Sequence, residues 1–400
     1  MSMEVISPRS RGFLFTNAHP SGCAAMVQQQ IEAARKGRSA PAVGGTSLII
    51  GASTGYGLAS RLACGFAYGM KTVGIFYERP PSGKKTGSAG WYNSAAFHGA
   101  AHGSGLSCAS LNGDAFSNPL KQQAIERLRD GFGPVDLVIY SLASPVRTHP
   151  DTGATLRSAL KPVGAPYTTK TIDLDKEQLV EVTIEPANQD EIDQTVAVMG
   201  GDDLRRWIDA LLGAKLLARG ARMIAYSYIG PQMTFPIYRS GTIGLAKEDL
   251  ERTTAELDRR LQAEINGNAW VSVNKAVVTQ ASAAIPGVPL YLSLLHSVLT
   301  DRGLEEQPIH QALRLLKDHV AEGAEPTLDT EGRIRLDDRE MQGEVQAEIT
   351  KRWNRVTSES LRADADFDGF KTEFRRLFGF EVPSVDYSKP VETEVPLPLD

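Results

Sequence analysis

Short runs of apolar residues, several ending at a glycine, alternate along the chain with segments whose apolar residues recur at helical spacing. A continuous apolar run of this length is typical of a strand covered on both faces, as in a parallel sheet. Six such strands are predicted, at residues 46–51, 71–78, 107–112, 135–141, 221–227 and 269–274. Helices are predicted between them, at residues 56–68, 87–103, 119–129, 190–198, 203–217 and 242–262. This order predicts an α/β fold with a Rossmann-like doubly wound parallel sheet.

Three segments depart from this alternation. The first 45 residues hold a predicted short strand at 9–15 and a helix at 24–36. Residues 146–190 are rich in Thr, Pro and Gly, and hairpin-like patterns at 171–174 and 180–184 indicate an insertion. After residue 281 the pattern predicts apolar helices at 290–299 and 309–320, a polar strand at 333–336, two more helices and, from 388, an extended tail.

We therefore expect one elaborated Rossmann-type domain over residues 1–400, with N-terminal, central and C-terminal extensions. Its nucleotide-binding core comprises residues 46–145 and 220–280, and residues 146–190 are the insertion. Residues 281–390 supply substrate-lid and C-terminal helices, of which the apolar helices near 285–299 fit either a buried core or a lid.

Composition narrows the class of protein. With 43 basic and 48 acidic residues the net charge is -5, which argues against a nucleic-acid partner. No apolar run is long enough to span a bilayer, and the N-terminus shows no signal-peptide pattern, so no membrane partner is expected. The three cysteines, Cys23, Cys64 and Cys108, lack CxxC spacing and suit reduced thiols. These features predict a cytoplasmic protein.

A glycine-rich turn follows the first core strand and opens a helix. Gly51 permits a tight turn, Gly55 allows the backbone to approach a pyrophosphate, and Gly57 allows close helix packing. The helix N-terminus adds free N–H groups and partial positive charge for the phosphates. The alternative is a glycine-rich connection in a sheet that binds nothing. The predicted cofactor-binding residues here are Gly51, Ala52, Ser53, Thr54, Gly55, Tyr56 and Gly57.

Glu78 indicates which dinucleotide binds. It ends the second strand, where a carboxylate accepts hydrogen bonds from the adenosine ribose and repels a 2′-phosphate, so NADH is expected. The neighbouring Arg79 is the opposing feature, because a guanidinium there can clamp the phosphate of NADPH. Further expected cofactor contacts follow the second, third and fourth strands: Tyr77, Asp114, Ala115, Leu142 and Ala143.

The spacing of tyrosine and lysine separates subclasses of such enzymes. None of the 11 tyrosines has a lysine four residues later, as typical short-chain dehydrogenases require. Tyr77 and Lys84 are seven apart but lie at the adenosine end. Tyr238 precedes Lys247 by nine residues, which on one helix would place them on opposite faces. We therefore expect Tyr238 in a loop before a helix capped by Ser240 or Thr242, unless it only packs beside Phe235 and Ile237.

These residues resemble one family. The Gly51 turn, Tyr228, the Tyr-x8-Lys pair and the run 273–282, VNKAVVTQAS, look like the FabV-type trans-2-enoyl-ACP/CoA reductases of the short-chain dehydrogenase/reductase superfamily. The N-terminal Arg11-Gly-Phe13 and the run 18–23 are also similar. The resemblance extends over nearly the whole chain. One departure is Glu248, where the family often has a second lysine.

The resemblance implies roles for individual residues. Tyr238 would be the proton donor, Tyr228 would contact the substrate carbonyl, and Lys247 would hold the nicotinamide ribose. Val277, Val278 and Thr279 would line the nicotinamide. A phenol aimed at the thioester oxygen stabilises the enolate that forms when hydride reaches the β-carbon, and a nearby Lys247 ammonium should ease proton donation.

The implied activity is reduction of an enoyl-ACP or enoyl-CoA by NADH, the last step of the fatty-acid elongation cycle. The resemblance also implies acyl carrier protein as partner and a monomeric enzyme. Two alternatives remain open at this level: an NAD(P)H-dependent carbonyl reductase of the same superfamily, and a non-catalytic NAD-binding sensor.

Two motifs resemble metal sites but lack ligands. Asp364, Asp366 and Asp368 begin like a calcium loop, yet Arg375 occupies the twelfth position. His98 and His102 share a helix face without an evident third ligand. No metal is therefore expected.

Overall fold

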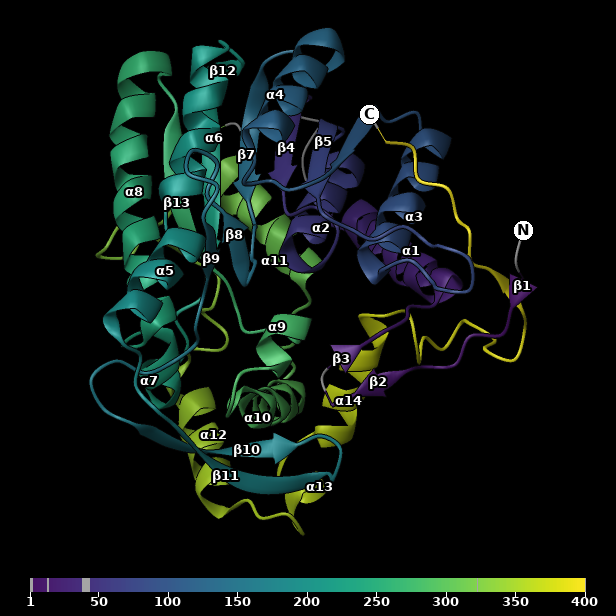
Figure 1. Ribbon diagram of the computed structural model, residues 1–400, viewed down its shortest axis with the longest axis vertical. Coiled ribbons are helices and arrows are strands. Elements are labelled where there is room, and N and C mark those ends of the chain that lie inside the picture. Colours follow the sequence, from purple (N-terminus) through teal and green to yellow (C-terminus); the bar gives the residue numbers. More distant parts are fainter. Residues whose placement is uncertain (1–2, 13, 38–43, 322, 400) are drawn as a thin grey trace.

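A seven-stranded parallel sheet forms the centre of the computed structural model, in the order β14-β13-β12-β7-β4-β5-β6 (Figure 1). All residues are described except 1–2, 13, 38–43, 322 and 400. The strands are β4 (Thr46–Ile50), β5 (Lys71–Phe76), β6 (Cys108–Asn112), β7 (Val135–Tyr140), β12 (Leu217–Ser227), β13 (Asn268–Val273) and β14 (Ile334–Arg335). The predicted doubly wound α/β fold is confirmed.

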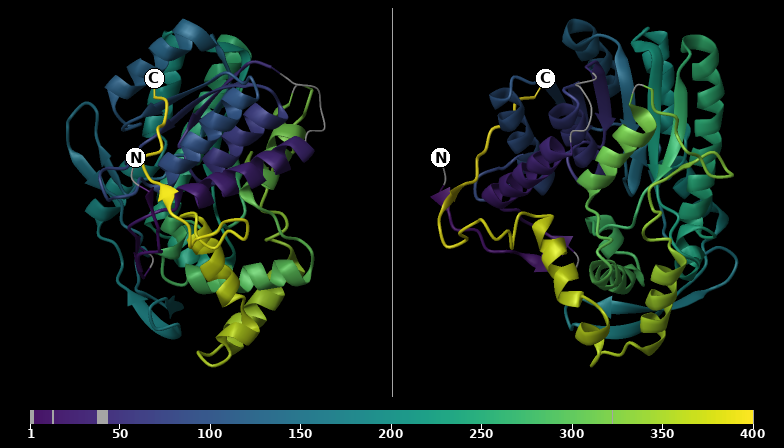
Figure 2. Two further views of the ribbon diagram at one scale, coloured as in Figure 1. Left: turned by 90° about the vertical axis from the view of Figure 1, so that its right-hand side faces the viewer. Right: turned by 180° about the vertical axis from the view of Figure 1, so that it is seen from behind.

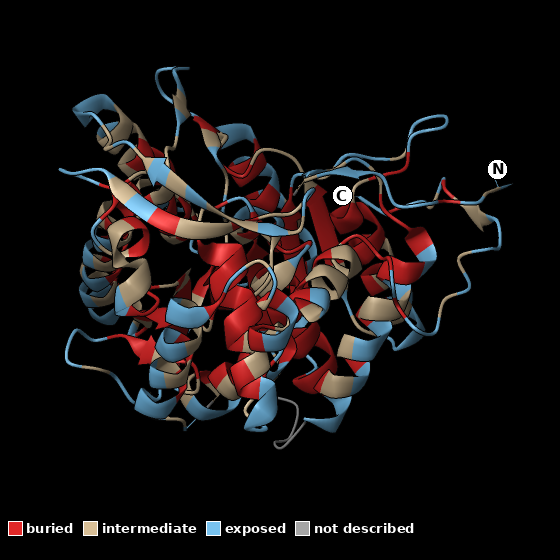
Figure 3. Cartoon of the chain, turned by 90° about the horizontal axis from the view of Figure 1, so that it is seen from below, coloured by how far each residue is buried: buried red, intermediate tan, exposed pale blue. Residues whose placement is uncertain are grey.

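Helices cover both faces of the sheet, which explains the continuous apolar runs. In β4 all residues are buried, but Leu48 and Ile50 pack with one core cluster and Ile49 with the other, because successive side chains point to opposite faces. One face carries α4 (Asn118–Arg127), α6 (Asp202–Gly213) and α8 (Thr242–Ile265). The other carries α1 (Pro20–Lys36), α2 (Gly55–Leu62), α3 (Ala89–Gly103) and α11 (Pro308–Leu315). Figure 3 shows buried residues gathered inside and exposed ones on outer surfaces.

The strand order creates a crevice at the carboxyl ends of β4 and β7. From β4 the chain proceeds outward through β5 and β6, then returns to the other side of β4 as β7. Connections on the two sides diverge at such a switch point, and open parallel sheets bind ligands there. The glycine turn at Gly51 and the segment beginning at Ser141 both leave the sheet at this point.

The hairpin of the insertion and the C-terminal helices lie below the sheet in Figure 1, beyond the strand ends. The insertion contains β8 (Val146–Thr148), β9 (Thr155–Arg157) and the hairpin of β10 (Tyr167–Asp173) and β11 (Gln178–Ile184), and α5 (Gln189–Met199) follows it. Near them lie the short α7 (Phe235–Tyr238), α9 (Gln280–Ala283) and α10 (Val288–Asp301). The C-terminal part adds α12 (Gly343–Arg355), α13 (Leu361–Asp364) and α14 (Phe367–Arg376).

Short segments near the two ends of the chain lie side by side (Figure 2). Strand β1 (Met3–Glu4) pairs antiparallel with β15 (Val391–Glu392). The tail continues along α3, where its backbone carbonyls accept hydrogen bonds from the side chains of Trp91 and Tyr92. The predicted extended tail is thus bound to the domain.

Several predicted boundaries are corrected. The helix predicted at 203–217 ends at Gly213, because Lys215 adopts a left-handed φ of 56° and β12 begins at Leu217. The strand predicted at 9–15 is instead the hairpin of β2 (Ser10–Arg11) and β3 (Leu14–Phe15), with residue 13 outside the described part. The polar strand predicted near 333–336 is the seventh strand of the sheet, β14.

Among the described helices, none has both the length and the apolar character needed to cross a membrane.

Candidate functional site

The glycine turn has the geometry that a dinucleotide requires. Gly51 has a φ of 91°, and a Cβ there would lie 2.4 Å from the backbone oxygen of Ser141. A Cβ on Gly57 would lie 1.9 Å from the backbone oxygen of Gly51, so any larger residue would push α2 away from the turn. At Gly55 no described heavy atom lies within 4 Å of the Cβ position. The turn is therefore tightly packed behind and open in front, where a pyrophosphate would approach.

Tyr56 differs from its neighbours in the turn because its side chain is already bonded. Its hydroxyl donates to the backbone oxygen of Lys275 at 2.7 Å and lies 3.0 Å from Oε1 of Gln311. This contact joins the start of α2 to the segment that follows β13. Tyr56 therefore supports the shape of the site through its side chain, and only its backbone is free to meet a phosphate.

Glu78 is held at the end of β5 by two hydroxyls. Ser53 Oγ donates to one carboxylate oxygen at 2.6 Å, and Ser88 Oγ donates to the other at 2.5 Å. Burial raises the pKa of Glu78, and the two serine hydrogen bonds oppose that shift. A Cβ on Gly90 would lie 2.0 Å from Oε1 of Glu78, so this glycine makes room for the carboxylate. Each carboxylate oxygen keeps a second lone pair for a ribose hydroxyl.

A cavity of about 880 Å³ runs across the carboxyl edge of the sheet beside these groups. Many ligand sites in enzymes have this size. The predicted cofactor residues that line it come from the glycine turn, from the end of β5 and from the segment after β13: Thr54, Gly55, Tyr77, Glu78, Val277, Val278 and Thr279. Arg79 also lines it. The cavity thus brings together residues more than 200 positions apart in sequence.

Four other expected cofactor residues follow β6 and β7 but do not line this cavity within the described part of the chain. Asp114 accepts a 2.9 Å bond from the backbone N–H of Phe116, and the backbone oxygen of Ala115 accepts one from Lys121. Leu142 and Ala143 continue the chain from β7 at the switch point. They lie at the predicted edge of the sheet, but their contact with a cofactor stays a prediction.

Tyr228 and Tyr238 meet at the same edge. Their ring centroids are 4.8 Å apart and perpendicular. Tyr238 is 8% exposed and borders a small second hollow with Ile237 and Val288. Its hydroxyl has no hydrogen-bond partner among the described residues. Tyr238 thus offers an O–H group that no neighbour in the described protein occupies.

The local structure around Tyr238 corrects one expectation. Tyr238 ends the one-turn helix α7 and is not in a loop. Helix α8 does begin at Thr242, but its N-cap is Gly241 and has no side-chain cap. Ser240 bonds Phe235 through its backbone, and the Thr242 hydroxyl donates to the backbone oxygen of Ala159. The helix start is therefore bound to the insertion and is not capped by its own hydroxyl.

Lys247 is a half-buried cation without an acceptor. Among the described residues its ammonium makes no hydrogen bond or ion pair. Burial lowers its pKa to about 8, although the negative charge of Glu251 acts in the opposite direction. The pKa of Tyr238 is raised, first by burial and then by Glu340. Lys247 is not among the groups that shift the pKa of Tyr238, so its expected easing of proton donation stays a prediction.

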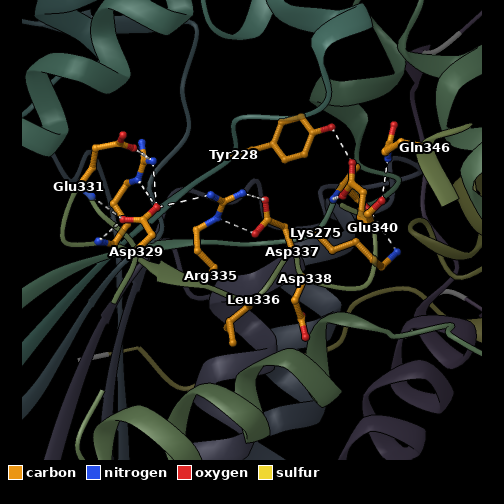
Figure 4. Close-up of polar contacts among 12 residues, drawn as sticks. Tyr228, Lys275, Asp329, Glu331, Arg335, Leu336, Asp337, Asp338, Glu340 and Gln346 are labelled. Carbon is orange, nitrogen blue, oxygen red and sulfur yellow. Dashed lines mark hydrogen bonds and ion pairs between the residues drawn. The ribbon is translucent and has the colours of Figure 1, made fainter. Parts of the chain in front are cut away.

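Sequence reasoning missed two charged residues at this edge, Lys275 and Glu340. Lys275 lines the cavity, and burial lowers its pKa. Glu340 is fully buried and bonds the hydroxyl of Tyr228 (Figure 4). Had the sequence shown that β14 joins the parallel sheet, Glu340 would have been predicted at the site, because the chain that leaves such a strand emerges at the carboxyl edge. The short polar sequence of that strand did not show that it joins the sheet.

The two metal-like motifs serve other contacts. Asp366 caps α14 and lies 2.7 Å from His296, and Asp364 bonds Arg355. His98 bonds the Ser110 hydroxyl at 2.7 Å. Within the described residues no group of three or more His, Cys, Asp or Glu side chains is arranged to hold a metal ion.

Models of one enzyme family match most of the chain. Residues 85–321 match the trans-2-enoyl-CoA reductase catalytic region. Residues 5–83 match the NAD(P)H binding domain of trans-2-enoyl-CoA reductase, and residues 328–391 match the enoyl reductase FAD binding domain.

Residues 328–391 do not fit a flavin site of their own. In their described part no glycine-rich turn joins a parallel strand to a helix, and β14 leads into a turn of bonded side chains. Four of these residues line one end of the large cavity that also contains the glycine turn: Glu373, Arg376, Leu377 and Phe378. The described residues present a single dinucleotide crevice.

Individual relatives agree with this match over their full length. The chain is 50% identical to enoyl-(acyl-carrier-protein) reductase (NADH) of Opitutus terrae, covering 98% of this chain and 100% of that one. It is 49% identical to trans-2-enoyl-CoA reductase (NADH) of Ruminiclostridium cellulolyticum, with 98% of each covered. The crystal structure of Treponema denticola trans-2-enoyl-CoA reductase in complex with NAD has a TM-score of 0.93 at 42% identity, with 98% of each chain covered. The chain therefore belongs to the trans-2-enoyl-CoA reductase family.

Proposed function

We propose that this protein reduces a trans-2-enoyl thioester with NADH, delivering hydride to the β-carbon and a proton from Tyr238, as the last step of the fatty-acid elongation cycle. The observation that carries the proposal is Tyr238, whose hydroxyl has no partner in the described chain and whose ring packs against Tyr228 at the sheet edge where the glycine turn opens. The full-length similarity to enoyl reductases supports it.

The chain's own residues would hold the cofactor through the glycine turn and Glu78. The backbone at Gly51–Gly57 and the N-terminus of α2 receive the pyrophosphate, and Glu78 accepts the ribose hydroxyls and disfavours a 2′-phosphate. Asp114, Ala115, Leu142 and Ala143 complete the adenosine and ribose walls. Val277, Val278 and Thr279 line the nicotinamide, which supplies the hydride when bound.

Tyr238 and Lys247 would be the catalytic residues that the protein supplies. The Tyr238 hydroxyl donates to the thioester oxygen as negative charge develops there, while Tyr228 contacts the substrate beside it. Burial keeps Tyr238 protonated at neutral pH, which suits a donor. The ammonium of Lys247, which has no hydrogen-bond acceptor among the described residues, holds the nicotinamide ribose and supplies positive charge.

The finer biological setting belongs to the same proposal. Acyl carrier protein is the proposed donor of the enoyl group, as the names of relatives suggest. We also propose a single elaborated domain, a monomer, and a cytoplasmic location in keeping with three cysteines that form no disulfide within the described residues. The insertion and the C-terminal helices lie over the strand ends, where they would form the substrate lid.

The test is NADH oxidation by the purified protein with crotonyl-CoA and, separately, acetoacetyl-CoA. The proposal expects steady turnover with crotonyl-CoA and little with acetoacetyl-CoA. The reverse preference would indicate a carbonyl reductase, and no oxidation with either substrate would indicate a sensor.

The variant Tyr238→Phe tests the proton donor. Turnover should fall by roughly 10²- to 10³-fold, the usual loss for one oxyanion donor, while NADH binding measured by fluorescence is retained. Tyr226→Phe is the matched control, because that buried hydroxyl bonds Ser60 and does not line the cavity. Near-normal turnover in Tyr238→Phe would refute the proposed role.

A further inference from the structure

One buried carboxylate joins the tyrosine pair to the cofactor wall. Glu340 is 0% exposed and lies in the turn between β14 and α12. Its Oε1 accepts hydrogen bonds from the hydroxyls of Tyr228 at 3.0 Å and Tyr291 at 2.6 Å. Its Oε2 accepts a 2.7 Å bond from the backbone N–H of Ala276. A buried carboxylate is costly unless donors surround it, and these three donors suit its ionised form.

The turn that carries Glu340 is held at both ends (Figure 4). Strand β14 pairs with β13, and its last residue, Arg335, forms two hydrogen bonds, at 2.8 and 2.7 Å, with the carboxylate of Asp337. From α12, the Gln346 amide donates to the backbone oxygen of Glu340 at 2.7 Å. The carboxylate therefore has a fixed position relative to the sheet edge, as a positioning group needs.

The direction of the hydrogen bonds distinguishes the two tyrosines. A phenol has one proton, and Tyr228 donates its proton to Glu340, so that proton is not available to a thioester oxygen. Tyr238, against whose ring Tyr228 packs, has a hydroxyl with no partner in the described chain.

The second carboxylate oxygen of Glu340 holds the backbone on the cofactor side of the site. The amide of Ala276 immediately precedes Val277 and Val278, which line the cavity. Lys275, one residue earlier, places a cation near Glu340 in Figure 4. One side chain thus sets the spacing between the phenols and the proposed nicotinamide wall.

We propose that Glu340 is a positioning residue for the reduction: it holds the Tyr228 hydroxyl and thereby fixes the ring on which Tyr238 rests, leaving Tyr238 as the phenol that donates. This inference rests on the proposed function. It assigns to the segment after β14 a direct part in the geometry of the reaction.

The experiment is a double-mutant cycle with Glu340→Gln and Tyr228→Phe. The glutamine oxygen still accepts from Ala276, so the Kd for NADH should stay within twofold, whereas its amide no longer accepts from Tyr228. We expect kcat with crotonyl-CoA to fall at least tenfold in Glu340→Gln. In the Tyr228→Phe background the same substitution should lower kcat less than twofold, because Glu340 acts through Tyr228.

The control is Asp338→Asn, which removes another carboxylate of the same turn that bonds Arg314 and contacts no tyrosine; its kcat should remain normal. If Glu340→Gln does not fold, Glu340→Asp replaces it, since the shorter side chain keeps the charge but withdraws it from Tyr228. A normal kcat, or an equal loss in both backgrounds, overturns the inference. If the Glu340 inference fails while the wild type turns over and Tyr238→Phe is inactive, the proposed function still stands. If the wild type itself shows no turnover, the proposed function and the Glu340 inference are both refuted.

Discussion

Burial, more than pairing, governs the protonation of the single residues proposed to react. The pKa values of Tyr228 and Tyr238 are raised by burial, so both phenols carry their protons at neutral pH. Burial lowers the pKa of Lys247 to about 8, which brings its loss of charge near the working range. A desolvated site of this kind also strengthens each hydrogen bond that a reacting oxygen would receive.

The titration of Lys247 predicts a pH dependence. The ammonium is present below pH 8 and is lost above it, so kcat/KM should fall about tenfold per pH unit on the alkaline side. The measurement is a pH–rate profile with crotonyl-CoA. In Lys247→Arg the guanidinium stays charged, so any residual activity should be flat over that range. A wild-type profile that stays flat to pH 10 would contradict a role for the ammonium.

Glu78 should set the choice of cofactor. Glu78→Ala removes the carboxylate that repels a 2′-phosphate, so the ratio of kcat/KM for NADH over NADPH should fall, with Arg79 free to bind the phosphate. Glu305→Ala is a matched control, because that carboxylate also lines the cavity but is distant in sequence from the glycine turn. An unchanged cofactor ratio in Glu78→Ala would refute the ribose role.

At the scale of elements, the contact between the glycine turn and α2 positions the phosphate site. The helix can begin directly at the turn only because Gly57 has no side chain against the backbone of Gly51. The same closeness directs the free N–H groups of the helix N-terminus toward the cavity. Strand, turn and helix therefore act as one unit.

Gly57→Ala tests that unit. The added Cβ would overlap the Gly51 oxygen, so α2 must shift, at a cost of about 1–3 kcal/mol in stability, and NADH binding should weaken strongly. Calorimetric titration with NADH and thermal unfolding measure the two effects. Gly99→Ala, inside α3 with no described heavy atom within 4 Å of its Cβ position, should bind normally and be slightly more stable. Unaltered NADH affinity in Gly57→Ala would contradict the tight packing.

For the whole molecule, the extensions are as important as the sheet. The N-terminal strand pairs with the C-terminal tail, and the tail is bonded to α3, whose first residues adjoin Glu78. Residues of the insertion and of α10 border the second hollow beside Tyr238. The large cavity is lined by residues 15–17, 373 and 376–378 as well as by residues of the core, so both terminal extensions help to enclose it.

Tyr92→Phe measures how much the tail contributes. The Tyr92 hydroxyl donates to the backbone oxygen of Thr393 at 2.8 Å and accepts from Gly87 at 2.9 Å. Losing this bridge should lower the free energy of unfolding by about 1–3 kcal/mol, because two buried backbone groups lose their partner. Tyr77→Phe is the control: Tyr77 is 82% exposed, so loss of its hydroxyl should leave the free energy of unfolding unchanged. Equal unfolding midpoints would show that the tail adds no stability through Tyr92.

The sequence by itself determined the parts that depend on local chemistry. Apolar runs marked the buried strands, Gly51–Gly57 marked the turn, and Glu78 followed from its place at a strand end. The spacing of Tyr238 and Lys247 indicated the subclass, since two residues nine positions apart on one helix lie on opposite faces. These features need only neighbours along the chain, or a spacing, to be recognised.

Only the tertiary structure decided what depends on partners far apart in sequence. It placed the short polar β14 in the sheet and so brought Glu340 to Tyr228, 112 residues away. It showed that the Tyr56 hydroxyl donates a hydrogen bond to the backbone oxygen of Lys275. It also showed that burial and Glu340, rather than Lys247, raise the pKa of Tyr238. Desolvation and long-range hydrogen bonds arise when the chain closes on itself, and no local pattern of residues records them.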